Sequence, residues 1–347
     1  MSIRWGMIGC GAVTEVKSGP GFQNARDSAL VAVMRRDGRR AEEYARRHGV
    51  PRWYDDADRL IADGQVDAVY IATPPGAHLE HALRVAGVGK PAYVEKPMAR
   101  NHAECLRMVE AFAAARLPLF VAYYRRALPR FVKARELIDA GRLGRITGVT
   151  SLSAGPVPAP DGRVRTGWHL RAEQSGGGLF IDSGCHTLDI LDFLLGPLAE
   201  VRGQAANLAG ISDVEDAVAM TFRIGGAPGA AQWNYASAVR EDLLQITGTQ
   251  GRLVLSTFGE EPVRLVGPEG DIASFDLPHP PCVQQPLIQS VVDELLGRGR
   301  CPSTGDSAAR TSAVMDLALA DYYAGRADAF WTRPHTWPGR VTPGPAR

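Results

Sequence analysis

A short apolar strand followed directly by a glycine turn opens the chain, and this combination limits the possible folds more than any other feature. Residues 3–8 (IRWGMI) are predicted to form a β-strand, and Gly9-x-Gly11 follows before a predicted helix. In that context the first glycine allows a tight turn, the second lets a pyrophosphate approach the backbone, and the helix N-terminus favours negative charge. Thr14 stands where the G-x-G-x-x-G pattern has its third glycine. The candidate nucleotide contacts in this turn are Gly9, Gly11, Ala12, Val13 and Thr14.

The next hundred residues alternate between strand and helix patterns. Strands are predicted at residues 30–34, 66–72, 91–95 and 119–122, and helices at 38–48, 78–88 and 101–115. The apolar run VDAVYIA suits a parallel strand that is covered on both faces. Such alternation predicts an α/β fold with a doubly wound parallel sheet. Residues 1–123 are therefore expected to form a Rossmann dinucleotide-binding domain.

The pattern changes after Tyr124. A helix is predicted at residues 129–140, and strands follow at 146–152, 199–206, 217–224, 229–235, 242–247 and 252–256. Two late helices are expected near residues 286–296 and 308–323. Short strands separated by turns such as Gly225-Gly226 are typical of antiparallel sheets. Residues 124–347 are expected to form an α+β domain that binds substrate, mediates oligomerisation and holds a mostly antiparallel open sheet.

Composition excludes several classes of protein. The chain carries 39 Lys and Arg against 38 Asp and Glu, so nothing in its charge favours nucleic-acid or membrane-surface binding. No apolar stretch reaches the length of a membrane span, and the N-terminus lacks the apolar run of a secretion signal. The five cysteines are scattered without a C-x-x-C pair, which argues against a disulfide framework or a zinc site. We expect a cytoplasmic protein.

The end of the second predicted strand bears on the choice of cofactor. An NAD site usually places Asp or Glu there to bind the ribose hydroxyls, whereas this chain has Arg35 and Arg36. A guanidinium at Arg35 suits a 2′-phosphate through bidentate hydrogen bonds, and Arg36 could stack on adenine. This favours NADP(H) over NAD(H). In the alternative interpretation the arginines form a solvated basic loop and Asp37 contacts the ribose instead.

Two segments follow later strands at the edge where ligands bind in such sheets. Lys96, in Glu95-Lys96-Pro97, could hydrogen-bond a substrate hydroxyl and stabilise a developing alkoxide, although a lysine after a strand is more often simply exposed. The earlier segment, Ala72-Thr73-Pro74-Pro75-x-x-His78, is a rigid turn that could border the dinucleotide. Its His78 could equally be a surface residue at the start of a helix. The candidate cofactor contacts here are Ala72, Thr73, Pro74, Pro75, His78, Glu95 and Lys96.

A glycine run in the second half leads into a segment with polar residues at regular spacing. Residues 175–189 read SGGGLFIDSGCHTLD, and their Asp182, His186 and Asp189 fall on one face of a helix. Taken alone, an Asp with a His four residues later is common on surface helices. The three side chains could also bind a metal, but no further cluster of His, Cys or carboxylates supports that, and we expect no metal site.

These elements in this order resemble the Gfo/Idh/MocA family, the group of glucose–fructose oxidoreductase and inositol dehydrogenase. The similarity covers almost the whole chain and includes the G-x-G turn, A-T-P-P-x-x-H, Glu95-Lys96-Pro97, Arg125-Arg126-x-x-Pro129 and the block G-G-G-x-x-x-D-x-G-x-H-x-x-D. The phrases R-W-G and V-A-V-M-R-R-D are most similar to the branch with dihydrodiol dehydrogenases and NADP-linked sugar oxidoreductases. The resemblance implies a Rossmann domain followed by an open sheet that often builds oligomers, here a dimer or tetramer.

The resemblance also implies roles for individual residues. Lys96 matches the family's catalytic lysine, and Asp182 and His186 match the acid and histidine of its second-domain block. Tyr124 stands where many relatives have a smaller polar residue, so it is a candidate substrate contact. Trp168 and His169, just before the glycine run, are further candidates for a wall against which a sugar stacks.

The predicted function is an NADP-dependent oxidoreductase that moves a hydride between nicotinamide C4 and a carbinol or carbonyl carbon of a sugar, cyclic polyol or sugar derivative. Hydride chemistry belongs to the cofactor, and the protein positions the reacting carbon and moves the proton. Two alternatives stay open at this point. One is a redox-neutral sugar-modifying enzyme that retains its cofactor, and the other is a non-catalytic NADP-binding regulator.

Overall fold

The computed structural model describes residues 2–156 and 167–340, which divide into two compact units. The first unit contains Met1–Ala99, Glu104–Leu128 and His279–Ala309, and the second contains Arg100–Ala103, Pro129–Pro278 and Arg310–Arg347. Within the described part of the chain, no helix is both long and apolar enough to cross a membrane.

The first unit holds a six-stranded sheet in which every strand pair is parallel. Its order, β3-β2-β1-β4-β5-β6, is that of a doubly wound dinucleotide-binding sheet, and the predicted fold class is confirmed. The short strand β3 was not predicted, because its three residues are too few to show a period. The strands are β1 (Ile3–Ile8), β2 (Ser28–Met34), β3 (Arg52–Tyr54), β4 (Ala68–Ile71), β5 (Ala92–Val94) and β6 (Leu119–Val121).

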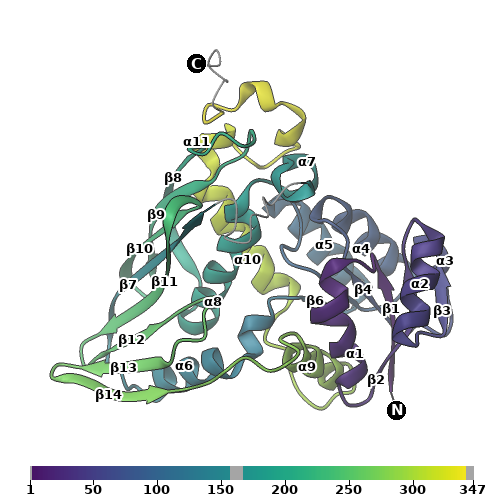
Figure 1. Ribbon diagram of the computed structural model, residues 1–347, viewed down its shortest axis with the longest axis horizontal. Coiled ribbons are helices and arrows are strands. Elements are labelled where there is room, and N and C mark those ends of the chain that lie inside the picture. Colours follow the sequence, from purple (N-terminus) through teal and green to yellow (C-terminus); the bar gives the residue numbers. More distant parts are fainter. Residues whose placement is uncertain (1, 157–166, 341–347) are drawn as a thin grey trace. The chain divides into compact units, whose positions relative to one another are not determined.

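Helices flank this sheet in the alternating order that the sequence predicts (Figure 1). The side chain of Asp37 caps the first turn of α2, and Gly49 ends that helix in the left-handed conformation, with a φ of 65°. Buried aromatic rings of Trp5, Phe22 and Tyr70 pack between β1, α1 and β4. The helices are η1 (Thr14–Ser18), α1 (Gly19–Asn24), α2 (Gly38–His48), α3 (Ala57–Ile61), η2 (Pro75–Ala77), α4 (His78–Gly87), α5 (His102–Ala115) and η3 (Tyr124–Ala127).

The segment His279–Ala309 differs from the expected domain organisation, because it belongs to the first unit and not to the unit formed by most of residues 124–347. Its helix α9 (Gln285–Leu295) packs against α1 and η3. A Cβ on Gly21 of α1 would lie 2.7 Å from the side chain of Ile288, which shows how closely the two helices approach. Burial of the apolar face of α9 on the Rossmann unit explains the difference.

The second unit contains an eight-stranded sheet of order β14-β13-β12-β11-β7-β10-β9-β8. All its strand pairs are antiparallel except β7 with β10, which confirms the predicted mostly antiparallel sheet. The hairpin of β13 and β14 was not predicted. The strands are β7 (Ile146–Pro156), β8 (Leu198–Ala206), β9 (Ala217–Ile224), β10 (Ala227–Asn234), β11 (Ala236–Gly248), β12 (Arg252–Leu255), β13 (Val263–Gly267) and β14 (Gly270–Phe275).

Helices of the second unit cover one face of this sheet (Figure 1). Phe180 of η5 contacts Trp233 of β10 at 4.8 Å between ring centroids. Buried and exposed residues alternate along β9, as expected for a sheet with one covered face. The helices are α6 (Pro129–Asp139), η4 (Trp168–Leu170), α7 (Ala172–Ser175), η5 (Phe180–Gly184), α8 (Cys185–Leu195), α10 (Gly305–Ala318), whose first turn up to Ala309 belongs to the first unit, α11 (Ala320–Tyr323), η6 (Phe330–Thr332) and η7 (Pro334–Thr336).

Candidate functional site

The glycine turn lies at the point of the first sheet where strand order reverses. Gly9 follows β1 and Thr73 follows the neighbouring strand β4. A Cβ on Gly9 would lie 2.9 Å from the backbone nitrogen of Thr73, and Gly9 also has a φ of 91°, so glycine is required there on two grounds. Crevices at such reversal points are where ligands bind in open α/β sheets.

Thr14 closes the turn upon itself. The N–H of Gly11 donates to Thr14 Oγ1 at 3.0 Å, and the Thr14 hydroxyl donates to the carbonyl of Gly11 at 2.8 Å. Thr14 is fully buried, and these bonds satisfy its hydroxyl together with the N–H and carbonyl of Gly11. A third glycine, as in the usual pattern, would leave the two Gly11 groups to other partners. Threonine at this position is therefore compatible with the turn.

The helix after the turn begins with a wide π-type segment, η1. Tyr44 of α2 donates its hydroxyl hydrogen to the carbonyl of Thr14 at 3.0 Å, and a Cβ on Gly19 would lie 2.7 Å from that hydroxyl. Gly19 thus lets the two helices approach each other closely. π-turns are rare in globular proteins and are frequent at functional sites.

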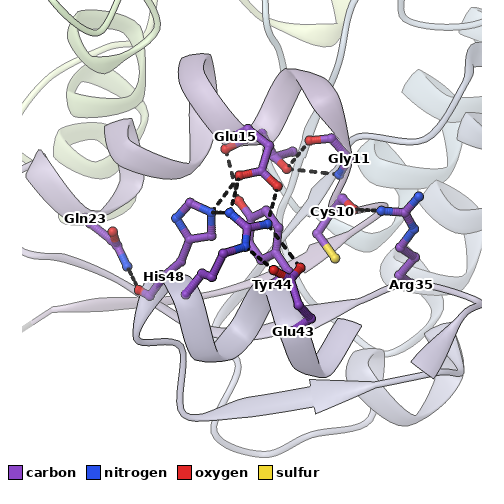
Figure 2. A network of polar contacts seen from close by, with 10 residues as sticks. Cys10, Gly11, Glu15, Gln23, Arg35, Glu43, Tyr44 and His48 are labelled. Carbon is purple, nitrogen blue, oxygen red and sulfur yellow. Dashed lines mark hydrogen bonds and ion pairs between the residues drawn. The ribbon is translucent and has the colours of Figure 1, made fainter. Parts of the chain in front are cut away.

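An ion-pair network surrounds the start of this helix (Figure 2). Arg47 of α2 donates to both carboxylate oxygens of Glu15, at 2.9 and 2.7 Å, and His48 contacts the same carboxylate at 2.8 Å. The Arg47 guanidinium lowers the pKa of Glu15 to about 2. The arginine also balances a negative charge that would repel a phosphate at this helix N-terminus.

Arg35 reaches from the end of β2 to the glycine turn (Figure 2). Its Nη1 donates to the carbonyl of Cys10 at 3.3 Å. Arg36 is exposed, and the Asp37 carboxylate accepts the N–H of Arg40 at the start of α2, as a helix cap does. Asp37 already has this structural role, which weakens the alternative in which it contacts the ribose. Burial raises the pKa of the Cys10 thiol to about 11.

His78 lies behind the turn that follows β4. Its ring is fully buried, with Nδ1 3.1 Å from the carbonyl of Met98 and Nε2 2.7 Å from the carbonyl of Thr73. Burial lowers the pKa of His78. The alternative of a surface histidine is therefore wrong. Because both nitrogens face backbone carbonyls, the geometry also favours a structural link between two loops over the predicted cofactor contact.

Glu95 anchors the backbone at Lys96. Its Oε1 accepts hydrogen bonds from the hydroxyl of Tyr70 and from Nε2 of Gln284, both at 2.7 Å, and its Oε2 accepts the N–H of Lys96 at 3.0 Å. The Glu95 carboxylate is buried, whereas Lys96 is partly exposed at the end of β5. Glu95 thus has the contacts of a residue that positions Lys96. Gln284 comes from the segment whose place in the first unit was not expected, and no sequence signal marked it.

Strand order brings the candidates of the first unit to one edge. Gly9, Thr73, Lys96 and Tyr124 follow the adjacent strands β1, β4, β5 and β6. Two strand spacings, roughly 10 Å, separate the ends of β1 and β5. The phenol oxygen of Tyr124, a buried residue, accepts a hydrogen bond from Arg125 at 3.0 Å. This edge therefore combines the glycine turn, a lysine and a tyrosine.

In the second unit, Glu215 holds the glycine run. The N–H of Gly178 donates to both Glu215 oxygens, at 2.8 and 2.9 Å, and the Tyr323 hydroxyl donates to Glu215 Oε2. A Cβ on Gly178 would lie 1.9 Å from the carbonyl oxygen of Glu215. Glu215 is fully buried, and this burial raises its pKa. The adjacent acids Glu215 and Asp216 before an alternating strand are the only sequence feature that could have indicated this contact.

The helix that starts at this glycine run carries Asp182 and His186. The N–H of Asp182 donates to the carbonyl of Gly178 at 3.3 Å, and Asp182 lies in the π-type segment η5, while His186 lies in the first turn of α8. His186 and Asp189 are buried. Because nearly all of α8 is buried, the alternative of a surface helix is wrong. Both π-type segments of the described chain thus coincide with predicted functional motifs.

Trp168 and His169 form the short helix η4 of the second unit. Their rings stack on each other with centroids 3.7 Å apart and an interplanar angle of 23°. Both residues are partly exposed. Among the side chains of residues 2–156 and 167–340, no group of three or more His, Cys, Asp or Glu is placed to hold a metal ion.

The sheet order, the glycine turn and the lysine at the strand edge define a dinucleotide-dependent oxidoreductase. Residues 3–123 match a family described as an oxidoreductase family with an NAD-binding Rossmann fold, and residues 131–254 match the GFO/IDH/MocA C-terminal domain. The chain belongs to the Gfo/Idh/MocA family of oxidoreductases.

Individual relatives extend these matches over most of the chain. Oxidoreductase P35 of Formosa agariphila is 35% identical over 324 residues, which cover 91% of this chain and 98% of the relative. A myo-inositol 2-dehydrogenase of Thermotoga maritima is 28% identical, covering 78% of this chain and 80% of the relative. The fold is also that of a levoglucosan dehydrogenase solved with NADH and levoglucosan, with a TM-score of 0.81, 20% identity and coverage of 92% and 98% of the two chains.

Proposed function

We propose that this protein is an NADP(H)-dependent oxidoreductase that transfers a hydride between nicotinamide C4 and a carbinol or carbonyl carbon of a sugar, cyclic polyol or sugar derivative. The observation that carries the cofactor preference is Arg35, whose guanidinium reaches the glycine turn from the end of β2. A carboxylate at that position would repel a 2′-phosphate, whereas a guanidinium can bind it through two parallel hydrogen bonds.

The glycine turn fits a dinucleotide. A Cβ on Gly11 would find nothing closer than the carbonyl oxygen of Gly9 at 3.7 Å, so this face of the turn is open to a pyrophosphate. The hydroxyl of Thr73 is buried and has no hydrogen-bond partner among the described residues, which offers a polar group at the same edge. The proposed cofactor contacts are Gly9, Gly11, Ala12, Val13, Thr14, Arg35, Arg36, Ala72, Thr73, Pro74, Pro75 and Lys96.

Lys96 has the chemistry of an electrostatic catalyst. Its ammonium group can donate a hydrogen bond to the reacting hydroxyl of the substrate and stabilise negative charge as that hydroxyl loses its proton. The buried carboxylate of Glu95 fixes the backbone at this lysine through the N–H of Lys96. When bound, the nicotinamide ring supplies the hydride acceptor or donor.

His186 is the proposed base for the hydroxyl proton. An imidazole titrates near neutral pH, so it can accept that proton in oxidation and return it in reduction. Asp182, four residues earlier on the same helical segment, is proposed to orient the imidazole or share its proton. Tyr124, Trp168 and His169 are proposed contacts with the substrate.

Relatives support the proposed substrate class. One bears the name of myo-inositol and one solved structure the name of levoglucosan, a cyclic polyol and an anhydrosugar respectively. Both present secondary hydroxyl groups on a ring. These two compounds are therefore suitable first probes of turnover.

The first experiment is a pair of fluorescence titrations with NADPH and NADH, after the purified protein has been checked for bound cofactor. Wild-type protein is expected to bind NADPH more tightly, and Arg35→Asp should shift the preference toward NADH. Arg39→Asp removes an exposed arginine of α2 as a matched control and should leave the preference unchanged. Equal relative affinities in wild type and Arg35→Asp would refute the phosphate contact.

A second experiment separates the proposed reaction from its alternatives. Oxidation of myo-inositol or levoglucosan with NADP⁺ should form NADPH in step with product. Product without net NADPH would instead indicate a redox-neutral reaction with retained cofactor. NADPH binding without turnover of a broad polyol and ketosugar panel would indicate a regulator. Assembly as a dimer or tetramer is also proposed, and light scattering of the purified protein tests it.

A further inference from the structure

Residues 256–261, in the connection between β12 and β13, are held by hydrogen bonds from two directions. On one side, the carboxylate of Asp242 in β11 accepts three consecutive backbone N–H groups. They belong to Thr257 at 2.8 Å, Phe258 at 2.6 Å and Gly259 at 2.9 Å. Successive N–H groups around one carboxylate form a strong, charge-assisted anion nest. Asp242 therefore fixes the backbone of this connection, named here the 256–261 loop.

Arg130 of α6 binds the hydrogen-bond acceptors of the same loop. Its guanidinium donates to the carbonyls of Gly259 and Glu261, the latter at 2.8 Å, and to the hydroxyl of Ser256 at 2.9 Å. Arg130 is only 1% exposed, so its charged guanidinium is shielded from water and is stabilised by these contacts. The Asp242 carboxylate accepts the N–H groups of the loop, and the buried Arg130 guanidinium donates to its carbonyls. Together they make this a rigid loop.

The rigid loop touches the candidate catalytic helix at two consecutive residues. The ring of Phe258 meets the imidazole of His186 edge to face, with centroids 5.9 Å apart and an interplanar angle of 84°. Thr257 Oγ1 lies 3.4 Å from Thr187 Oγ1. His186 is 5% exposed, so its ring has little room to turn without displacing Phe258.

We propose that the 256–261 loop sets the orientation of the His186 imidazole, with Phe258 as the positioning residue and Asp242 and Arg130 as the clamp that holds Phe258 in place. The inference rests on the proposed function for its effect on turnover. A general base is effective only when its nitrogen is held within hydrogen-bond reach of the proton that it takes. A ring held against a neighbouring aromatic ring meets that requirement better than one free to rotate.

The first part of the test does not depend on turnover. The imidazole signals of the eight histidines are recorded by NMR on protein with labelled histidine, and a His186→Gln variant assigns the signal of His186. Phe258→Leu keeps an apolar side chain but removes the aromatic ring current, so the His186 signal should move whatever the orientation of the imidazole. The orientation itself is tested by Asp242→Asn, which keeps the ring of Phe258. Asp242→Asn should move it as well, because a neutral amide holds the three N–H groups less firmly. Phe258→Tyr, which keeps the ring, should restore a signal close to wild type.

Matched controls lie on the same sheet. Phe275→Leu removes an aromatic ring at the end of β14, and Asp271→Asn removes a carboxylate that pairs with Arg264. Asp271 accepts hydrogen bonds from Arg264 of β13, and the centroid of the Phe275 ring lies 5.2 Å from Nζ of Lys133 in α6. Both controls should leave the His186 signal where it is. A shift of equal size in the controls would overturn the inference.

The second part of the test uses turnover of myo-inositol or levoglucosan. Phe258→Leu should lower kcat about tenfold, a fraction of what a general base supplies, with KM nearly unchanged. The primary deuterium isotope effect on kcat should rise, because a misplaced base makes the chemical step slower than product release. That isotope effect does not depend on the fraction of folded protein. Phe258→Tyr should recover kcat.

The two parts separate the failure of the inference from the failure of the proposed function. An unchanged His186 signal in Asp242→Asn overturns the inference whatever the turnover. A moved signal with wild-type kcat and isotope effect overturns it too, because the orientation would then not matter for the reaction. Absence of turnover in the wild type would refute the proposed function, and the NMR comparison would still decide whether the loop orients His186.

Discussion

The carboxylate of Glu215 accepts the backbone N–H of Gly178 with both of its oxygens, at 2.8 and 2.9 Å. A residue 37 positions away in sequence thus supplies the cap for the helical segment that carries Asp182 and His186. A negative charge at a helix N-terminus interacts favourably with the helix dipole. The glycine run has no side chain that could cap the helix itself. Because it lacks side chains, it also leaves room for Glu215.

Replacement of Glu215 by glutamine tests this cap. Glutamine keeps the shape but turns one acceptor into a donor, which would face the Gly178 N–H or the Tyr323 hydroxyl. A buried donor left without an acceptor costs about 1–3 kcal/mol. We expect calorimetry to show a fall in Tm of roughly 2–4 °C for each of those kcal/mol.

Glu200→Gln is the control for Glu215→Gln, because Glu200 is an exposed acid of β8 that pairs with Arg223. Exposed pairs of this kind contribute about 0–1 kcal/mol, so its Tm should stay near that of wild type. Equal Tm values for Glu215→Gln and wild type would show that the cap does not stabilise the unit.

Two glycines of the same turn should respond differently to alanine. At Gly9 the φ of 91° and the backbone of Thr73 at 2.9 Å both oppose a side chain, so Gly9→Ala should lower Tm by several degrees. At Gly11 the nearest atom is 3.7 Å away, so Gly11→Ala should keep the Tm within about 2 °C.

The effect of Gly11→Ala should instead appear in cofactor binding. The added methyl group would occupy the open face that a pyrophosphate needs, and we expect the Kd for NADPH to rise at least about tenfold. Fluorescence titration measures this directly. A Gly11→Ala protein with wild-type affinity would place the pyrophosphate elsewhere.

The sequence predicted the doubly wound parallel sheet and five of its six strands, because apolar runs and glycine turns are local signals. It also placed Lys96 and Arg35 correctly at strand ends. The two π-type segments could not be predicted, because they depend on tertiary packing such as the approach of Tyr44 to Gly19. The spacing of apolar residues in one sequence indicates a helix, but it does not distinguish a π-type turn from an α-helical turn.

Long-range partners were the other features beyond the reach of sequence. Nothing local shows that Glu215 caps a helix that begins near Gly178, or that the amide of Gln284 meets Glu95. The segment His279–Ala309 has an apolar helix face, and such a face does not reveal which unit covers it. Motif positions were therefore predictable from the sequence, whereas the residues that hold the motifs in place are distant in sequence and could not be predicted from it.

Lys96→Met should separate chemistry from cofactor binding. Methionine has a similar length and no charge, so it removes the proposed hydrogen bond to the substrate hydroxyl. Loss of one such donor lowers turnover by about 10²–10³-fold, and we expect kcat to fall in that range. The Kd for NADPH should stay near wild type, because Lys96 is only one of the twelve proposed cofactor contacts and the glycine turn and Arg35 are unchanged.

Lys133→Met is the matched control for Lys96→Met, because Lys133 forms a surface ion pair with Glu136 in the second unit. Its kcat should equal that of wild type. Turnover of Lys96→Met at the wild-type rate would remove this lysine from the mechanism.

The ion pair of Glu15 with Arg47 should make stability depend on pH. Because the Arg47 guanidinium lowers the pKa of Glu15 to about 2, the pair stabilises the fold above the ordinary carboxyl pKa near 4.3, and this contribution is lost as pH falls through about 2. The Glu15 side chain is 33% exposed, so the contribution is about 1 kcal/mol at most.

Glu15→Gln should therefore unfold at lower urea than wild type near neutral pH, and the difference should shrink as the pH falls below about 4.3. Tryptophan fluorescence along urea titrations at several pH values measures this. Glu80→Gln removes an exposed ion pair with Arg84 on α4 and should show a much smaller difference at every pH. If the difference between wild type and Glu15→Gln is the same at pH values above and below the carboxyl pKa, it arises from packing at this helix start, and the charge of Glu15 does not stabilise the fold.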